Sequence, residues 1–292
     1  MESKKKEDPV TELKHLHILR GFLITIGSWP TEIFEPQTHR QSLAKFTLVL
    51  ACLIIIGEIM YIQKNISVLS FFDLGNILMT VFLTALSVVR ATLPILPNYP
   101  RIIKSFVTEF HLIHFRHKGG YYEKTYNKIN KFSHYFTMVM VLNMIMGPTL
   151  FNLVPLYTNY VNGAFQENRT ADLKLQSSMY MSFPGYTQED HLLVSTIMDF
   201  FLSCICSILI CATEILMYLM AFQIIGHIQI LLHDLQQIPR PKRPIVFNAF
   251  FRETNEHNNL NLEIYDGEDN NLVRNEIVNL VEHHKFIVRL VR

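Results

Sequence analysis

The chain alternates long apolar runs with polar, basic segments, and this alternation predicts its main elements. The longest run is Leu192–Leu232, 41 residues with no proline and one glycine. As one helix it would be about 60 Å long, whereas a bilayer core needs only about 20 apolar residues. We therefore predict a span over 193–214 that continues as a solvated or protein-covered helix to about residue 235.

Three further apolar runs predict three more spans, near 46–62, 68–93 and 134–157. Pro148, inside the third of these runs, cannot donate to the carbonyl of Met144, so a kink is expected there. The predicted fold is all-α, a polytopic transmembrane helix bundle that occupies residues 43–235.

The remaining segments are mostly polar, with scattered apolar residues. Residues 1–42 are predicted to hold a short surface helix that ends near Gly27, with Trp29 at the membrane interface. Residues 236–271 are predicted to be a loop, and 272–292 an amphipathic helix, because apolar residues recur there at three-four spacing. This helix is expected to pack on the extension of the fourth span through Ile277, Leu280, Val281, Ile287 and Val288.

Composition supports a membrane protein and excludes several other classes. The chain is 49% hydrophobic and 17% charged, against about 25% charge in a soluble domain. Its net charge of +1 provides no field that would attract nucleic acid. No paired carboxylates, Ser/His/Asp set or Gly-rich phosphate loop is present, so we expect neither an enzyme nor a cofactor.

A metal site is not expected either. The four cysteines, Cys52, Cys204, Cys206 and Cys211, all lie in apolar runs, where a thiol behaves as a small hydrophobe. His111, His114 and His117 recur at three-residue spacing, which could hold zinc. A solvated helix face is the commoner reading of such a pattern, because no carboxylate or thiolate completes the set.

The distribution of basic residues predicts the orientation of the bundle. Lys and Arg number six in residues 1–42, one in 63–67, seven in 98–132, two in 158–191 and five in 234–276. Cytosolic segments carry the excess of positive charge, so the N-terminus and the extension of the fourth span are predicted to be cytosolic. The sequon at Asn168 would then lie outside, where it could be glycosylated.

The order and spacing of several segments resemble those of insect odorant receptors. They are the LRGFLITIGSWP entry segment, the short first turn, the basic 98–132 segment, the long fourth helix ending HIQILLHDL, and the closing VNLVEHHKFIVRLVR. The resemblance implies a seven-span architecture with the N-terminus inside. Four spans are present and a fifth begins at the end of the sequence, so the chain is expected to be truncated at its C-terminus.

The same resemblance implies a function. It indicates a tuning subunit in the plasma membrane of olfactory sensory neurons. Such a subunit binds a small volatile odorant and forms an odorant-gated, non-selective cation channel, as a hetero-tetramer with an odorant co-receptor. Two alternatives stay open: a gustatory-type receptor, and a truncated membrane interaction protein that does not conduct.

An odorant pocket needs apolar walls, soft side chains and one or two polar groups. The outer halves of three spans provide candidates, and each of them could equally pack between helices or face lipid. Asp199 is the ionisable residue deepest in the outer half, either at an interface or in a pocket. The candidate ligand-binding residues are Phe72, Asn76, Met79, Thr80, Gly147, Phe151, Met198, Phe201 and Leu202.

Overall fold

The computed structural model describes residues 13–34, 41–166, 175–186, 188, 191–238, 244–251, 256–263 and 267–291. Four long helices dominate the chain. The α-helices are α1 (Lys14–Thr25), α2 (Thr31–Phe34), α3 (Gln41–Asn65), α4 (Phe71–Thr92), α5 (Tyr99–Ser105), α6 (Gly120–Val161), α7 (Leu192–Gln236) and α8 (Gly267–Val291). Short π and 3-10 turns fill the path from Phe106 to Lys118, between α5 and α6.

Four of these helices are long and apolar enough to cross a membrane: α3, α4, α6 and α7. The prediction of four spans is therefore confirmed. Helices α3 and α6 extend beyond the predicted apolar windows, most of all α6, which begins at Gly120 rather than near residue 134, whereas α4 falls within the predicted 68–93. The reason is that hydropathy marks only the part of a helix that matches the bilayer, whereas polar turns at its ends remain helical.

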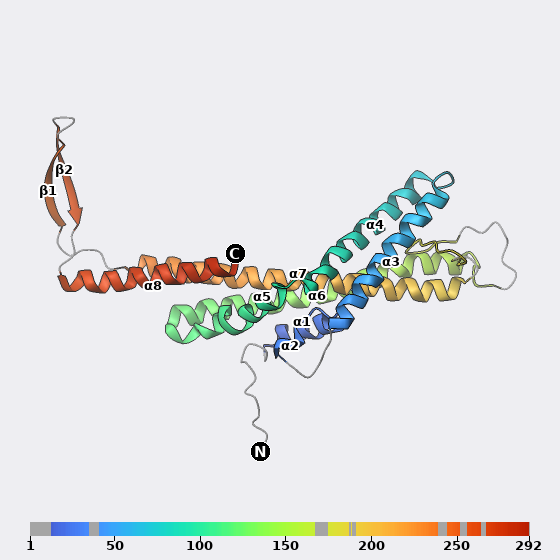
Figure 1. The fold of residues 1–292 in the computed structure, drawn as a ribbon, viewed down its shortest axis with the longest axis horizontal. Coiled ribbons are helices and arrows are strands. Elements are labelled where there is room, and N and C mark those ends of the chain that lie inside the picture. Colours follow the sequence, from blue (N-terminus) through green and yellow to red (C-terminus); the bar gives the residue numbers. More distant parts are fainter. Residues whose placement is uncertain are drawn as a thin grey trace, which may run out of the picture.

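The helices α6 and α7 run antiparallel and form the long axis of the molecule (Figure 1). Pro148 and Pro155 lie inside α6, and each frees the carbonyl four residues earlier because proline has no N–H. The Ser207 hydroxyl of α7 donates to the Met144 carbonyl at 3.0 Å. The Ser178 hydroxyl donates to the Phe151 carbonyl at 3.4 Å. Both freed acceptors are thus satisfied from outside α6, as a membrane interior requires.

The helices α3 and α4 form a second pair, which leans away from the α6–α7 pair toward one end (Figure 1). We call this end, where α6 connects to α7 through residues 162–191, the loop end. Ser70 caps α4 there by accepting from the Asp73 amide at 3.2 Å. At the opposite end of α4, Arg90 forms an ion pair with Glu214 of α7 at 3.2 Å.

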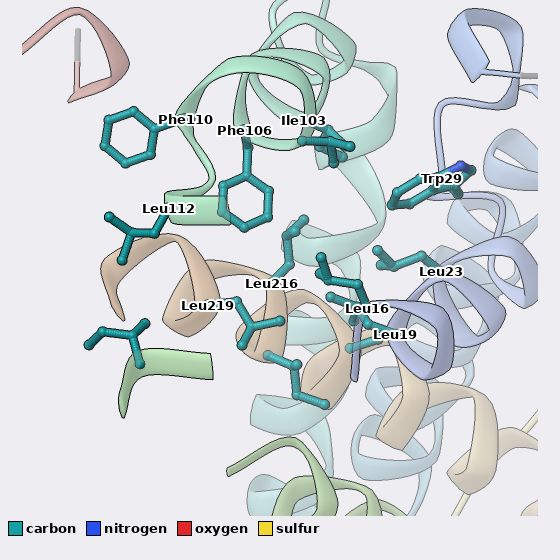
Figure 2. Close-up of a cluster of buried hydrophobic side chains, with 14 of the residues drawn as sticks. Leu16, Leu19, Leu23, Trp29, Ile103, Phe106, Phe110, Leu112, Leu216 and Leu219 are labelled. Carbon is teal, nitrogen blue, oxygen red and sulfur yellow. The ribbon is translucent and has the colours of Figure 1, made fainter. Parts of the chain in front are cut away.

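The main hydrophobic core lies where α1, α5 and the turns that follow meet α6 and α7; we call this region the junction. Leu16, Leu19 and Leu23 recur at three-four spacing on α1 and are buried. Figure 2 shows these side chains and Trp29 gathered in one cluster with Ile103, Phe106, and Leu216 and Leu219 of α7.

Two predictions for the N-terminal segment can be compared with the junction. The helix does stop before Gly27, whose φ of +72° ends α1. The surface placement is wrong, because Trp29 is only 5% exposed and stacks on Phe34 with ring centroids 5.1 Å apart. Burial of the apolar face of α1 in the junction outweighs the preference of Trp for the membrane interface.

The segment after α7 differs from the loop predicted over 236–271. Strand β1 (Pro244–Phe251) pairs with β2 (Glu256–Glu263) in an antiparallel hairpin, with Pro244 opposite Glu263. Figure 1 shows this hairpin standing away from the helices, beside the start of α8. Helix α8 begins at Gly267, five residues before the predicted 272.

Helix α8 lies alongside the C-terminal part of α7 (Figure 1), as predicted, but with a different face toward it. Of the expected contact residues, Ile287 is buried, Leu280 and Val288 are half-buried, and Ile277 and Val281 are exposed. Polar and aromatic contacts set the rotation. His227 Nε2 donates to the Phe110 carbonyl at 2.7 Å, so its Nδ1 accepts from His283 Nε2 at 3.0 Å. Phe286 stacks on Phe110 with centroids 5.3 Å apart.

Candidate ligand cavity

A cavity of about 360 Å³ lies between α4, α6 and α7, toward the loop end from the junction. Its wall is almost entirely apolar, and its volume is within the range of pockets that bind small molecules. We call it the span cavity. It is lined by Thr80, Leu83, Thr84, Asn143, Gly147, Pro148, Phe151, Met179, Ser203, Cys206, Ser207, Ile210 and Cys211.

The α4 wall of the span cavity follows from one stripe of residues. Ile77, Thr80, Thr84, Ser87 and Ala91 recur at three-four spacing and are the buried positions of α4. The Thr80 hydroxyl donates to the Ile77 carbonyl at 2.8 Å, and the Thr84 hydroxyl donates to the Thr80 carbonyl at 3.0 Å. Because both hydroxyl protons are used within the helix, the threonines present a largely apolar wall.

The opposite wall depends on α6. Gly147 has no side chain, and a Cβ built on it would meet nothing within 4 Å. Asn152 holds the α6–α7 contact one turn farther on, where its Nδ2 donates to Ser203 Oγ and to the Pro148 carbonyl, both at 2.7 Å. The space beside Gly147 is therefore open, within a helix pair that is fixed on either side by hydrogen bonds.

Residues 175–188, where described, fold over the loop end and bring Met179 into the lining of the span cavity. Asn159 of α6 fixes the start of this segment: its Nδ2 donates to the Gln176 carbonyl at 2.6 Å, and its Oδ1 accepts from the Gln176 amide at 2.9 Å. Asp199 of α7 accepts from the Ser177 hydroxyl and, at 3.4 Å, from the Met179 amide.

The sequence-based candidates separate into three groups. Thr80, Gly147 and Phe151 come together in the lining of the span cavity. Leu202 is 3% exposed and belongs instead to a small cluster with Ile54, Met179 and Met181. The other five side chains lie on the outer surface of the helices and do not meet in this cavity; they are Phe72, Asn76, Met79, Met198 and Phe201.

Sequence reasoning missed several lining residues, among them Thr84, Met179, Ser203 and Cys206. The stripe of small residues on α4 was the available signal, because small residues mark the faces where transmembrane helices approach. Nothing in the sequence indicated that residues 175–188 would return to the bundle and place Met179 in the cavity.

The other candidate sites are not assembled. His111 Nδ1 accepts from the Ile113 amide, and His114 Nε2 donates to the Val107 carbonyl. His117 Nε2 accepts from Arg116 Nε, so the three rings form separate contacts. Within the described ranges no group of three or more His, Cys, Asp or Glu side chains could hold a metal ion. Asn168 lies outside the described residues, so its glycosylation stays a prediction.

Comparison with known families identifies the class of protein. The family model described as 7tm Odorant receptor matches residues 74–292, well over half of the chain. The chain therefore belongs to the odorant receptor family, a family of multi-pass membrane chemosensory receptors rather than enzymes. No curated protein and no solved structure matches it significantly. The resemblance read from the sequence is confirmed at the level of the family.

Proposed function

We propose that this chain is an odorant-tuning subunit that binds a small volatile molecule in the span cavity and, with a co-receptor, contributes to an odorant-gated cation channel in the plasma membrane of olfactory neurons. The observation that carries the proposal is an apolar cavity of about 360 Å³ between three candidate spans of an odorant receptor family member. Volatile odorants are small and mostly apolar, and such walls bind them by excluding water.

The proposal includes an orientation. The N-terminal segment and residues 98–132 carry six and seven Lys and Arg, whereas 158–191 carries two. Because positive segments stay in the cytosol, the junction and α8 are cytosolic and the loop end is outside. Met179 then lines the span cavity toward the side from which odorants arrive.

Cys206 provides a direct test, because its thiol lies in the cavity lining. In a chain whose other three cysteines are replaced by serine, a small methanethiosulfonate reagent should label Cys206 in lipid nanodiscs. A bound volatile from a panel of esters, ketones and alcohols should slow this labelling, by about tenfold at ten times its Kd.

A matched pair of glycine variants locates the binding. Gly147→Val fills the cavity from a position where a Cβ is accommodated, so it should abolish protection by the volatile. Gly75→Val, at a position of α4 that is equally open but outside the lining, should leave protection intact. Labelling of Cys206 that no volatile in the panel slows would refute the proposed binding site.

A further inference from the structure

Glu58 of α3 is a buried acid that forms no hydrogen bond of ordinary geometry in the described part of the chain. Its side chain is 0% exposed, and neither carboxyl oxygen forms a hydrogen bond within the described part of the chain. A buried carboxylate without a partner is costly in a protein interior, and more so in a membrane. Such a group is therefore stable either as the neutral carboxylic acid or as a carboxylate paired with a positively charged ligand.

Glu58 does not itself line the span cavity, but it lies next to three residues that do. The hydroxyls of Thr84 and Thr80 lie within interaction range of its carboxyl group, although neither makes a hydrogen bond of ordinary geometry to it, and the Cys206 thiol lies within electrostatic range. All three of these neighbours line the cavity. The two hydroxyls donate to backbone carbonyls of α4, so they have no proton left for the carboxylate but keep lone pairs that can accept.

A second acid adds to the negative character of this region. Asp199 is 2% exposed and lies within electrostatic range of Glu58. Its Oδ2 accepts from Ser177 and from the Met179 amide, whereas its Oδ1 has no partner among the described atoms. Asp199 therefore holds Ser177 and Met179 in place, and Glu58 is the acid left for a ligand.

No basic side chain of the described spans is placed to neutralise Glu58. Arg90 is engaged with Glu214 at the junction end of α4. Lys64 is exposed at the loop end of α3, six residues beyond Glu58. A positive charge that reached the wall at Thr80 and Thr84 would therefore be stabilised by Glu58.

We propose that the span cavity is selective for small alkylamines, whose ammonium group is held between Thr80 and Thr84 against the carboxylate of Glu58 while the alkyl chain fills the apolar space. This inference rests on the proposed function and names its ligand class. The neutral amine enters, the O–H bond of the Glu58 carboxylic acid breaks, and that proton forms the new N–H bond. The product is an ammonium–carboxylate pair, and no other reactant is required.

The test compares two ligands of equal length, n-hexylamine and 1-hexanol, by their protection of Cys206 from labelling. In the chain that keeps Glu58 and has Cys206 as its one cysteine, the amine should bind about ten- to a hundredfold more tightly than the alcohol, the range for a hydrogen bond to a charged partner. Glu58→Gln keeps the shape and removes the charge, so it should reduce this ratio to about one without weakening 1-hexanol.

Two controls separate the charge at the cavity from other effects. Glu58→Asp retains the acid and should retain a preference for the amine. Glu123→Gln removes an exposed acid of α6 far from the cavity and should change neither ligand. Equal protection by both ligands, or an amine preference that survives Glu58→Gln, would overturn the inference and leave the cavity as an odorant site. Absence of protection by these two ligands and by the whole volatile panel would instead refute the proposed function.

Discussion

The close approach of α7 to the turn after α5 depends on one glycine, and its replacement tests the packing of the junction. A Cβ at Gly226 would lie 2.3 Å from Leu112 Cδ1 and 3.3 Å from Ile129 Cγ1. Ordinary carbon contacts are about 3.5–4.0 Å, so Leu112, which is 1% exposed, would have to move by more than 1 Å. The turn that carries Leu112 is also held by its amide, which donates to Gln223 Oε1 at 3.0 Å.

The expected change in the free energy of unfolding follows from two opposing effects. Overpacking a well-filled core costs about 1–3 kcal/mol, whereas alanine in place of glycine stabilises a helix by about 1 kcal/mol. Gly226→Ala should therefore lower the free energy of unfolding by up to about 2 kcal/mol. Gly21→Ala is the matched control, because Gly21 lies inside α1 and a Cβ there meets nothing within 4 Å. This variant should be stabilised by up to about 1 kcal/mol.

Trp29 provides the assay, because it is the only tryptophan and lies in the junction core. Its fluorescence during denaturant titration in micelles reports the unfolding of this region. Gly226→Ala should unfold at lower denaturant than the wild type, and Gly21→Ala at equal or higher denaturant. If both variants were stabilised alike, the close contact between Gly226 and Leu112 would not exist, and the junction would be packed differently.

Three further predictions test other parts of the account. An epitope tag at residue 2 should be reachable only in permeabilised cells, because the proposed orientation, based on the positive charge of the N-terminal segment, places it in the cytosol; labelling on intact cells would reverse the orientation. Ser207→Ala leaves the Met144 carbonyl without its donor and should destabilise the bundle by about 1–3 kcal/mol. Ser207→Thr keeps the hydroxyl and should therefore lose less stability. Equal losses in the two variants would exclude the hydrogen bond as the cause. Burial lowers the pKa of His111 to about 3, below the value of about 6.5 for a histidine in the unfolded chain. Between these two values the unfolded chain binds a proton that the folded chain does not. The free energy of unfolding therefore falls as pH drops below about 6.5. His111→Gln should reduce the stability lost between pH 7.5 and pH 5 by about 2 kcal/mol in the Trp29 assay; an unchanged loss would contradict the neutral burial of this ring.

The spans were predictable because length and hydropathy suffice for them. The run that begins at Leu192 is too long and too apolar for any other element, and the three shorter runs need only a window of about 20 residues. The hairpin was missed because Glu256–Glu263 is polar and rich in asparagine, a composition that favours loops, although Pro244–Phe251 is mostly apolar and suits a strand.

The faces of the spans were harder to predict than their existence. A helix in water shows its buried face by its apolar residues, but lipid makes the outer face of a span equally apolar. Phe72 and Met79 therefore looked as suitable for a pocket as Thr80, although only Thr80 lines the span cavity. The buried face of α4 is instead its stripe of small and polar residues, such as Thr84 and Ser87. Burial of Trp29 was missed for a related reason, since an interface preference says nothing about the partner helices.

The central claim is that a volatile ligand occupies the cavity between α4, α6 and α7, and photo-crosslinking tests it most directly. An alkyl diazirine of odorant size, irradiated with the chain in nanodiscs, should modify peptides that contain Phe151, Met179 or Cys206. An excess of the parent volatile should suppress this modification. Crosslinks confined to exposed residues on the outer surface of the helices, such as Phe72 and Met79, or to α8, with no competition by the volatile, would contradict the account.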